Sequence, residues 1–187
     1  MGESPLLGNH FLTNFPDAAV MTAYRRLILP EGTHFFTLCL EDRTSHVLVD
    51  HIAHLRAAYA FTVREMPVEC HAMVVLPNHL HAIWTEPGIP KFPERWRRIK
   101  ARFSHSVAGD FKPNSSQAAR QERGVWQRRF YEHAIRNQEE LSAAMDYFRM
   151  NPVKHGFVSE PDLWAFSSFA RRTEMMGQSP ILRVANA

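Results

Sequence analysis

Two histidines separated by a single residue, His79 and His81, are the side chains of this sequence best placed for metal chemistry. They follow the turn-forming residues 77–78 and begin an apolar, β-like run that ends at Trp84. Because successive side chains of a strand point to opposite faces, both imidazoles are expected on the same face. Imidazole is the commonest protein ligand of metals, so this pair supplies half of a metal site.

A tyrosine far downstream, Tyr147, can complete a reactive site with them. On a helical wheel Tyr147 lies off the centre of an apolar stripe, and Asn151 follows one turn later on the same side. If that side faces the histidines, two imidazoles, a phenol and a carboxamide meet, and Asn151 with solvent completes the shell of a divalent cation. This set suits phosphoryl transfer, because a phenol with a pKa of about 10 needs a nearby cation to attack at neutral pH.

The elements that must position these residues follow from the hydrophobic pattern. Alternating and apolar runs predict strands at 33–40, 68–76 and 80–84, and helical spacing predicts helices at 50–64, from Trp96 to Val107, and from Asn137 to about Asn151, before Pro152. Asp50 and Asn137 are the expected N-caps. The order predicts an α+β fold, a small antiparallel sheet with helices packed on one face, as in ferredoxin-like or RRM-like sandwiches.

Length and composition predict one domain. The chain has 187 residues, 45% of them hydrophobic and 22% charged, which is enough for a single core. We expect a flexible extension at 1–20, one catalytic domain at 21–172 with a mobile polar loop at 109–124, and a tail at 173–187. Two unpaired cysteines, with no signal peptide or membrane span in the sequence, predict a cytoplasmic protein without a membrane partner.

The basic residues indicate a nucleic-acid partner by their distribution, since the net charge is only +3. Three arginines form a stripe along one predicted helix, and others alternate with aromatic residues that could stack on unpaired bases. A solvated helix face is the alternative explanation of the stripe. The predicted nucleic-acid contacts are Arg25, Arg26, Arg95, Arg98, Arg102, Trp126, Arg128, Arg129, Arg136 and Lys154.

Five segments, in this order, closely resemble the REP-associated tyrosine transposases, a family of His-hydrophobic-His transposases and nickases of single-stranded DNA. They are residues 24–26 (YRR), 33–37 (THFFT), 74–81 (VVLPNHLH), 126–137 (WQRRFYEHAIRN) and 146–156 (DYFRMNPVKHG). The resemblance extends from about Tyr24 to Phe169.

The resemblance implies a mechanism. His79 and His81 would bind Mg²⁺ or Mn²⁺, and Tyr147 would attack a phosphate of single-stranded DNA at a repetitive palindromic hairpin, leaving a 5′-phosphotyrosine and a free 3′-OH. Related transposases place a Gln one turn after the nucleophile as a third ligand, where this chain has the shorter Asn151. His133 and His155 could orient ligands or bind phosphate, although His155 could simply cap a helix.

Two other functions stay open at this point. A domesticated protein could bind hairpins without cleaving them, and a metallohydrolase could cleave small phosphodiesters with water. The hydrolase is disfavoured, because the chain has no second His-x-His pair, His-x-Thr/Ser pair or two-metal carboxylate cluster. A monomer with its site in one chain and a homodimer that exchanges the tyrosine helix are both compatible with the sequence.

Overall fold

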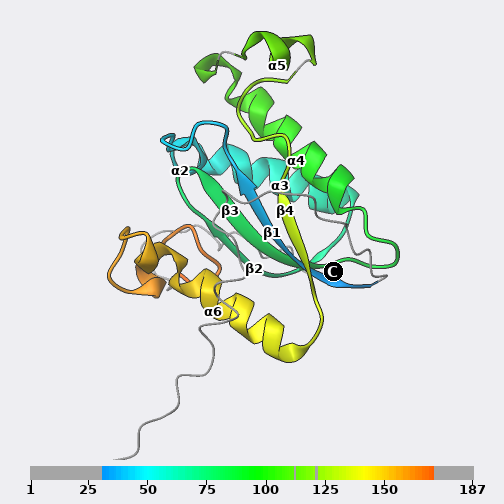
Figure 1. The fold of residues 1–187 in the computed structure, drawn as a ribbon, viewed down its shortest axis with the longest axis vertical. Coiled ribbons are helices and arrows are strands. Elements are labelled where there is room, and N and C mark those ends of the chain that lie inside the picture. The colour runs from blue at the N-terminus through cyan, green and yellow to red at the C-terminus, as the bar shows by residue number, and fades with distance from the viewer. Residues whose placement is uncertain (1–30, 112, 121, 171–187) are drawn as a thin grey trace, which may run out of the picture.

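The computed structural model describes residues 31–170 except 112 and 121 (Figure 1). Four strands form one antiparallel sheet in the order β2-β3-β1-β4. The strands are β1 (Thr33–Cys39), β2 (Glu69–Val75), β3 (His79–Thr85) and β4 (Tyr131–Ile135). The helices are α2 (Val47–Asp50), α3 (Ile52–Glu65), α4 (Phe92–Ser106), α5 (Ser115–Ala119) and α6 (Gln138–Lys154), with short 3-10 turns η1 (Ala108–Asp110) and η2 (Pro161–Leu163). The predicted α+β class with a small antiparallel sheet is confirmed.

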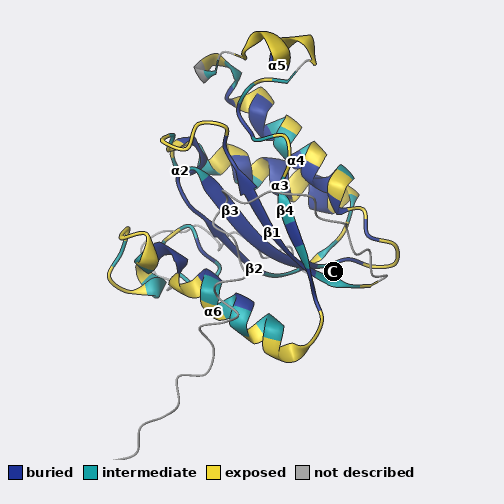
Figure 2. Ribbon diagram, viewed as in Figure 1, coloured by how far each residue is buried: buried dark blue, intermediate teal, exposed yellow. Residues whose placement is uncertain are grey.

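One face of the sheet is covered by α3 and α4, as predicted (Figure 1). The apolar stripe of α4 is fully buried there, and Trp96 stacks on Trp84 of β3 with ring centroids 4.0 Å apart. The sides of both helices that face the sheet are buried and their outer sides are exposed (Figure 2). This core packs against the face of β3 opposite to the one that carries His79 and His81.

The opposite face is covered by α6, which differs from the prediction that all helices pack on one face (Figure 1). The reason lies in β1, which carries large apolar side chains on both sides: Phe36 faces α4, and Phe35 faces α6. Ala144 and Phe148 of α6 close a second core over Phe35. The histidines of β3 share this face, so α6 covers them too.

The ends of two helices differ from the sequence prediction. Asp50 is the last residue of α2 and does not cap α3, whose N-cap position is occupied by His51 without a side-chain bond. Helix α6 continues through Pro152 to Lys154, because a proline near the end of a helix removes only one hydrogen bond. The helix then ends where Gly156, at φ 73°, donates to Val153 O (2.9 Å) and Phe157 N donates to Pro152 O (3.0 Å).

The predicted mobile loop at 109–124 contains helix α5. Asn114 and Gln117 form a reciprocal capping box at its N-terminus, with both bonds 2.9 Å long, and a local cap of this kind is not visible in the hydrophobic pattern. The predicted extension at 1–20 and the tail at 173–187 lie outside the described residues. No helix among the residues described is long and apolar enough to cross a membrane.

Candidate active site on the α6 face of the sheet

The two histidines lie on one face of β3, as their spacing predicts. His79 is opposite Cys39 and His81 is opposite Thr37 in the antiparallel register with β1. Their ring centroids are 5.0 Å apart, and both residues are buried. The strand therefore presents two imidazoles together under helix α6.

Each imidazole is held by a bond at Nδ1. His81 Nδ1 is 2.8 Å from Thr37 Oγ1, and His79 Nδ1 is 2.6 Å from Asn78 Oδ1. We assign the proton to Nδ1 in both rings, because an amide oxygen accepts it from His79 and the Thr37 hydroxyl can accept it from His81. The Nε2 lone pairs are then available, and His81 Nε2 is buried without a hydrogen-bond partner in the described part of the chain.

Both imidazoles are neutral at physiological pH. Burial, together with the charges of Arg43 and His155, lowers the pKa of His79 to about 3. Burial also lowers the pKa of His81 well below its ordinary value, with smaller effects from His79, His155 and Arg43. Neutral imidazole is the form that can bind a metal ion.

Helix α6 brings Tyr147 to these histidines. Asn137 starts the helix by accepting a hydrogen bond from Glu140 N (2.8 Å), and Phe148 fixes the rotation of the helix by packing on Phe35 at 5.0 Å between ring centroids. The half-buried ring of Tyr147 is then 5.5 Å from the ring of His81. One chain therefore assembles the tyrosine and the histidines without a second subunit.

Lys154 lies about two helical turns after Tyr147 on α6. Its Nζ atom is 5.1 Å from the ring centroid of Tyr147, and the residue is exposed. A cation at this position favours negative charge on the phenol oxygen and on any anion that approaches it.

Asn151, the predicted third metal ligand, is one of the buried residues of α6. It is 1% exposed, and its Oδ1 atom has no hydrogen-bond partner in the described residues. A buried amide oxygen without a partner is costly unless a cation or water satisfies it. Among these residues no group of three or more His, Cys, Asp or Glu is arranged to hold a metal.

The other two histidines predicted near the site occupy different positions. His155 is the C-cap of α6, and its ring centroid is 5.3 Å from that of His79, so it does border the site. His133, on β4, lies opposite Phe35 of β1 in the sheet, and its Nε2 atom is 3.6 Å from Glu140 Oε2. Glu140 lies in the first turn of α6.

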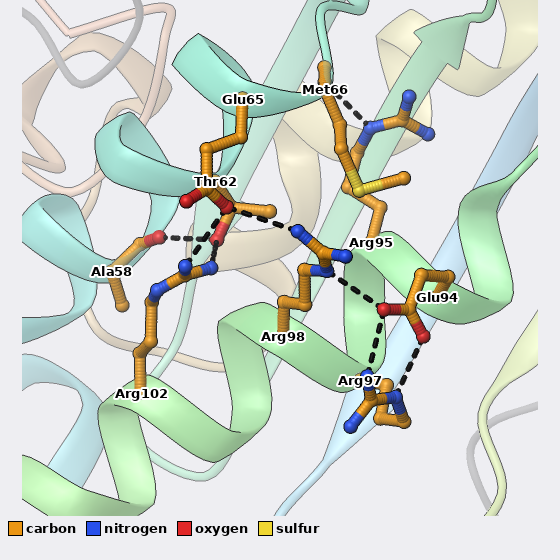
Figure 3. Close-up of polar contacts among 9 residues, drawn as sticks. All are labelled: Ala58, Thr62, Glu65, Met66, Glu94, Arg95, Arg97, Arg98 and Arg102. Carbon is orange, nitrogen blue, oxygen red and sulfur yellow. Dashed lines mark hydrogen bonds and ion pairs between the residues drawn. The ribbon is translucent and has the colours of Figure 1, made fainter.

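The arginine stripe on α4 faces α3, and the predicted nucleic-acid contact of Arg95 is contradicted by its burial. Arg95 is 3% exposed, forms an ion pair with Glu86 and donates to Met66 O and Pro67 O. Figure 3 shows the neighbouring charges. Arg98 donates to Glu65 and Glu94, and Arg102 donates to Glu65 and Thr62. Arg97 also donates to Glu94, so three arginines of α4 share two carboxylates.

The remaining predicted contacts divide into three groups. Trp126 is 8% exposed and packs on Phe103, so its predicted stacking on a base is contradicted, because this indole completes the core. The exposed members are Arg128, Arg129, Arg136 and Lys154. Arg25 and Arg26 lie outside the described residues.

Two residues of the site were missed from the sequence. Asn78 appeared only as a turn former, yet it orients His79. Arg43, whose charge acts on both histidines, lies in an exposed loop, where periodicity gives no signal.

Comparison with known proteins identifies relatives that share this fold. No family model matches the chain. A REP-associated tyrosine transposase of Escherichia coli (strain K12) is 41% identical over 152 residues, which are 81% of this chain and 84% of that protein. A Haemophilus influenzae protein described under the same family name is 37% identical over 153 residues, 81% of this chain and 87% of its own length.

A solved structure agrees with these sequences. A REP-associated tyrosine transposase bound to a REP hairpin superposes with a TM-score of 0.69 at 41% identity, and the match covers 86% of this chain and 90% of that one. The chain belongs to the family of REP-associated tyrosine transposases.

Proposed function

We propose that this protein nicks and rejoins single-stranded DNA at repetitive palindromic hairpins through a covalent bond to Tyr147. The observation that carries the proposal is the 5.5 Å approach of the Tyr147 ring to His81, whose buried Nε2 atom has no partner in the described residues. The solved relative that is bound to a REP hairpin supports the same substrate class for this chain.

The residues present fit a divalent cation, Mg²⁺ or Mn²⁺. His79 and His81 would hold it through Nε2, and Asn151 through Oδ1, since Thr37 and Asn78 already engage the Nδ1 atoms. When bound, such a cation supplies Lewis-acid stabilisation of the charge on the phosphodiester and on the attacking oxygen.

The residues of the chain perform the transfer. The phenol oxygen of Tyr147 forms the new bond to phosphorus and releases its proton to solvent. The bond from phosphorus to the 3′ oxygen breaks, and that oxygen leaves with the electron pair and takes up a proton as a 3′-OH. The 5′ phosphate stays on Tyr147, and attack by a 3′-OH on this linkage reverses the step and rejoins the strand.

The structure suggests how the nucleophile is held for this step. Phe35 and Phe148 pack around the Tyr147 ring at centroid distances of 6.2 and 6.4 Å, which limits its rotation. Lys154 places an ammonium group 5.1 Å from the same ring, where it attracts both the phenolate and the DNA backbone.

The test is covalent capture of labelled DNA. Single-stranded hairpin DNA labelled at its 3′ end is incubated with Mn²⁺ or Mg²⁺ and run on a denaturing protein gel. We expect a labelled protein band that is absent with chelator and absent in Tyr147→Phe, while Tyr131→Phe, a matched change on β4 that also contacts Phe35, retains it. Binding of hairpins by the wild type without a band in either metal would instead support a domesticated DNA-binding protein.

A further inference from the structure

Arg43 is a charged residue that the chemistry above does not use, and Asn78 bonds both its carbonyl and the ring of His79. It lies in the exposed segment between β1 and α2, and its charge acts on both His79 and His81. Asp42, its neighbour, is engaged by Thr44, whose N and Oγ1 atoms donate to Oδ1 at 2.8 and 2.7 Å. In the described part of the chain no carboxylate forms an ion pair with Arg43.

A single side chain ties Arg43 to the site. The Asn78 amide donates from Nδ2 to the carbonyl of Arg43, and its Oδ1 accepts from His79 Nδ1 at 2.6 Å. The backbone of Asn78 is fixed in turn, because Leu40 N donates to its carbonyl at 2.8 Å. The position of the Arg43 backbone is therefore coupled to the orientation of the His79 ring.

The charge of Arg43 would affect a cation bound at the proposed site. Two positive charges repel, so Arg43 lowers the affinity of the histidine pair for a bare divalent ion. An anion that Arg43 binds would offset this repulsion when a cation is held by the histidines. A guanidinium matches the two non-bridging oxygens of a phosphodiester in a bidentate arrangement.

We propose that Arg43 binds the non-bridging oxygens of a DNA phosphodiester at the His79–His81 site, and that Asn78 is the positioning residue that holds Arg43 and His79 in register. The inference rests on the proposed function, whose substrate phosphate it locates. A donor aimed at these oxygens also stabilises the charge that they carry during transfer.

The test compares Arg43→Met with Arg64→Met, which removes the same charge from an exposed position on α3, on the other face of the sheet. Three quantities are measured on the full chain: the affinity for Mn²⁺ alone by electron paramagnetic resonance, hairpin DNA affinity against salt in the presence of chelator, and the rate of covalent capture with Mn²⁺. For Arg43→Met we expect Mn²⁺ affinity to rise about twofold or more, the salt slope to fall by about 1, and capture to slow by about 10²–10³-fold. Arg64→Met should change none of the three.

The outcomes separate this inference from the proposed function. Unchanged salt slope and unchanged capture in Arg43→Met would overturn the inference. A wild type that captures no DNA, combined with a reduced salt slope in Arg43→Met, would refute the nicking function and retain the anion site.

A second variant tests the positioning residue. Asn78→Asp can still accept from His79 Nδ1 but cannot donate to the Arg43 carbonyl, so we expect Mn²⁺ binding to persist while capture slows. Asn78→Ala loses both bonds and should weaken Mn²⁺ binding by about 10–100-fold. Equal capture rates in Asn78→Asp and wild type would contradict the positioning assignment.

Discussion

Thr37 offers the sharpest test of how the site is prepared for a cation. Its hydroxyl is 2.8 Å from His81 Nδ1, the pair is buried, and in the tautomer assigned above the hydroxyl oxygen accepts the proton of Nδ1. Thr37→Val keeps the shape and the β-branching of the side chain but leaves the His81 N–H without an acceptor. A buried donor without a partner costs about 1–3 kcal/mol. In a chain of this size that lowers the melting temperature by about 3 °C for each kcal/mol.

The same change should affect metal binding, because the Thr37 bond orients the imidazole. Loss of such an orienting bond weakens metal affinity by about 10–100-fold. Calorimetric melting and Mn²⁺ titration of the variant measure the two effects. Thr33→Val is the matched control, since Thr33 bonds Thr85 at 2.6 Å at the far end of the same strand. The reasoning is refuted if Thr37→Val binds Mn²⁺ like the wild type and melts no lower than Thr33→Val.

Three further predictions concern stability. Burial lowers the pKa of His79 from 6.5 to about 3, so the folded state favours the neutral ring. The free energy of unfolding should therefore be highest above pH 6.5 and fall as the pH drops toward 3. Urea denaturation at a series of pH values should show that this free energy depends less on pH in His79→Asn than in the wild type. Arg95→Met leaves Glu86 buried without its ion pair and should lower the free energy of unfolding by about 3–5 kcal/mol. The side chain of Arg97 is 69% exposed, so Arg97→Met should change this free energy by about 1 kcal/mol or less in the same denaturation experiment. Asn137→Ala removes the cap of α6 and should cost about 1 kcal/mol; an unchanged melting temperature would show that the cap does not stabilise the helix.

The parts of the fold that sequence predicts well are those with a strong period. Alternation in β3 places His79 and His81 on one face, and the spacing of Trp96, Ile99 and Phe103 gives the buried side of α4. The hydrophobic pattern does not show in the same way whether helices cover one face of the sheet or both. Adjacent phenylalanines in β1 predict a strand without saying that each side needs its own helix.

Charge was the weakest guide to the site. Arg95 and Arg128 are both arginines near aromatic residues in the sequence, yet one is buried against Glu86 and the other is exposed. The burial of Arg95 depends on Glu86, a carboxylate just after β3 that only the folded chain brings close to it. For the same reason Arg43 was missed, since the sequence does not show that Asn78 bonds both the Arg43 carbonyl and the His79 ring.

The most direct test of the central claim is to identify the residue that carries DNA after capture. Wild-type protein is trapped with hairpin DNA and Mn²⁺, digested with nuclease and protease, and the nucleotide-bearing peptide is sequenced by mass spectrometry. The account predicts one modified residue, Tyr147, joined to the 5′ phosphate of the fragment, with a 3′-OH on the released strand. Modification of Tyr59 or Tyr131, or cleaved DNA with no peptide attached, would contradict it.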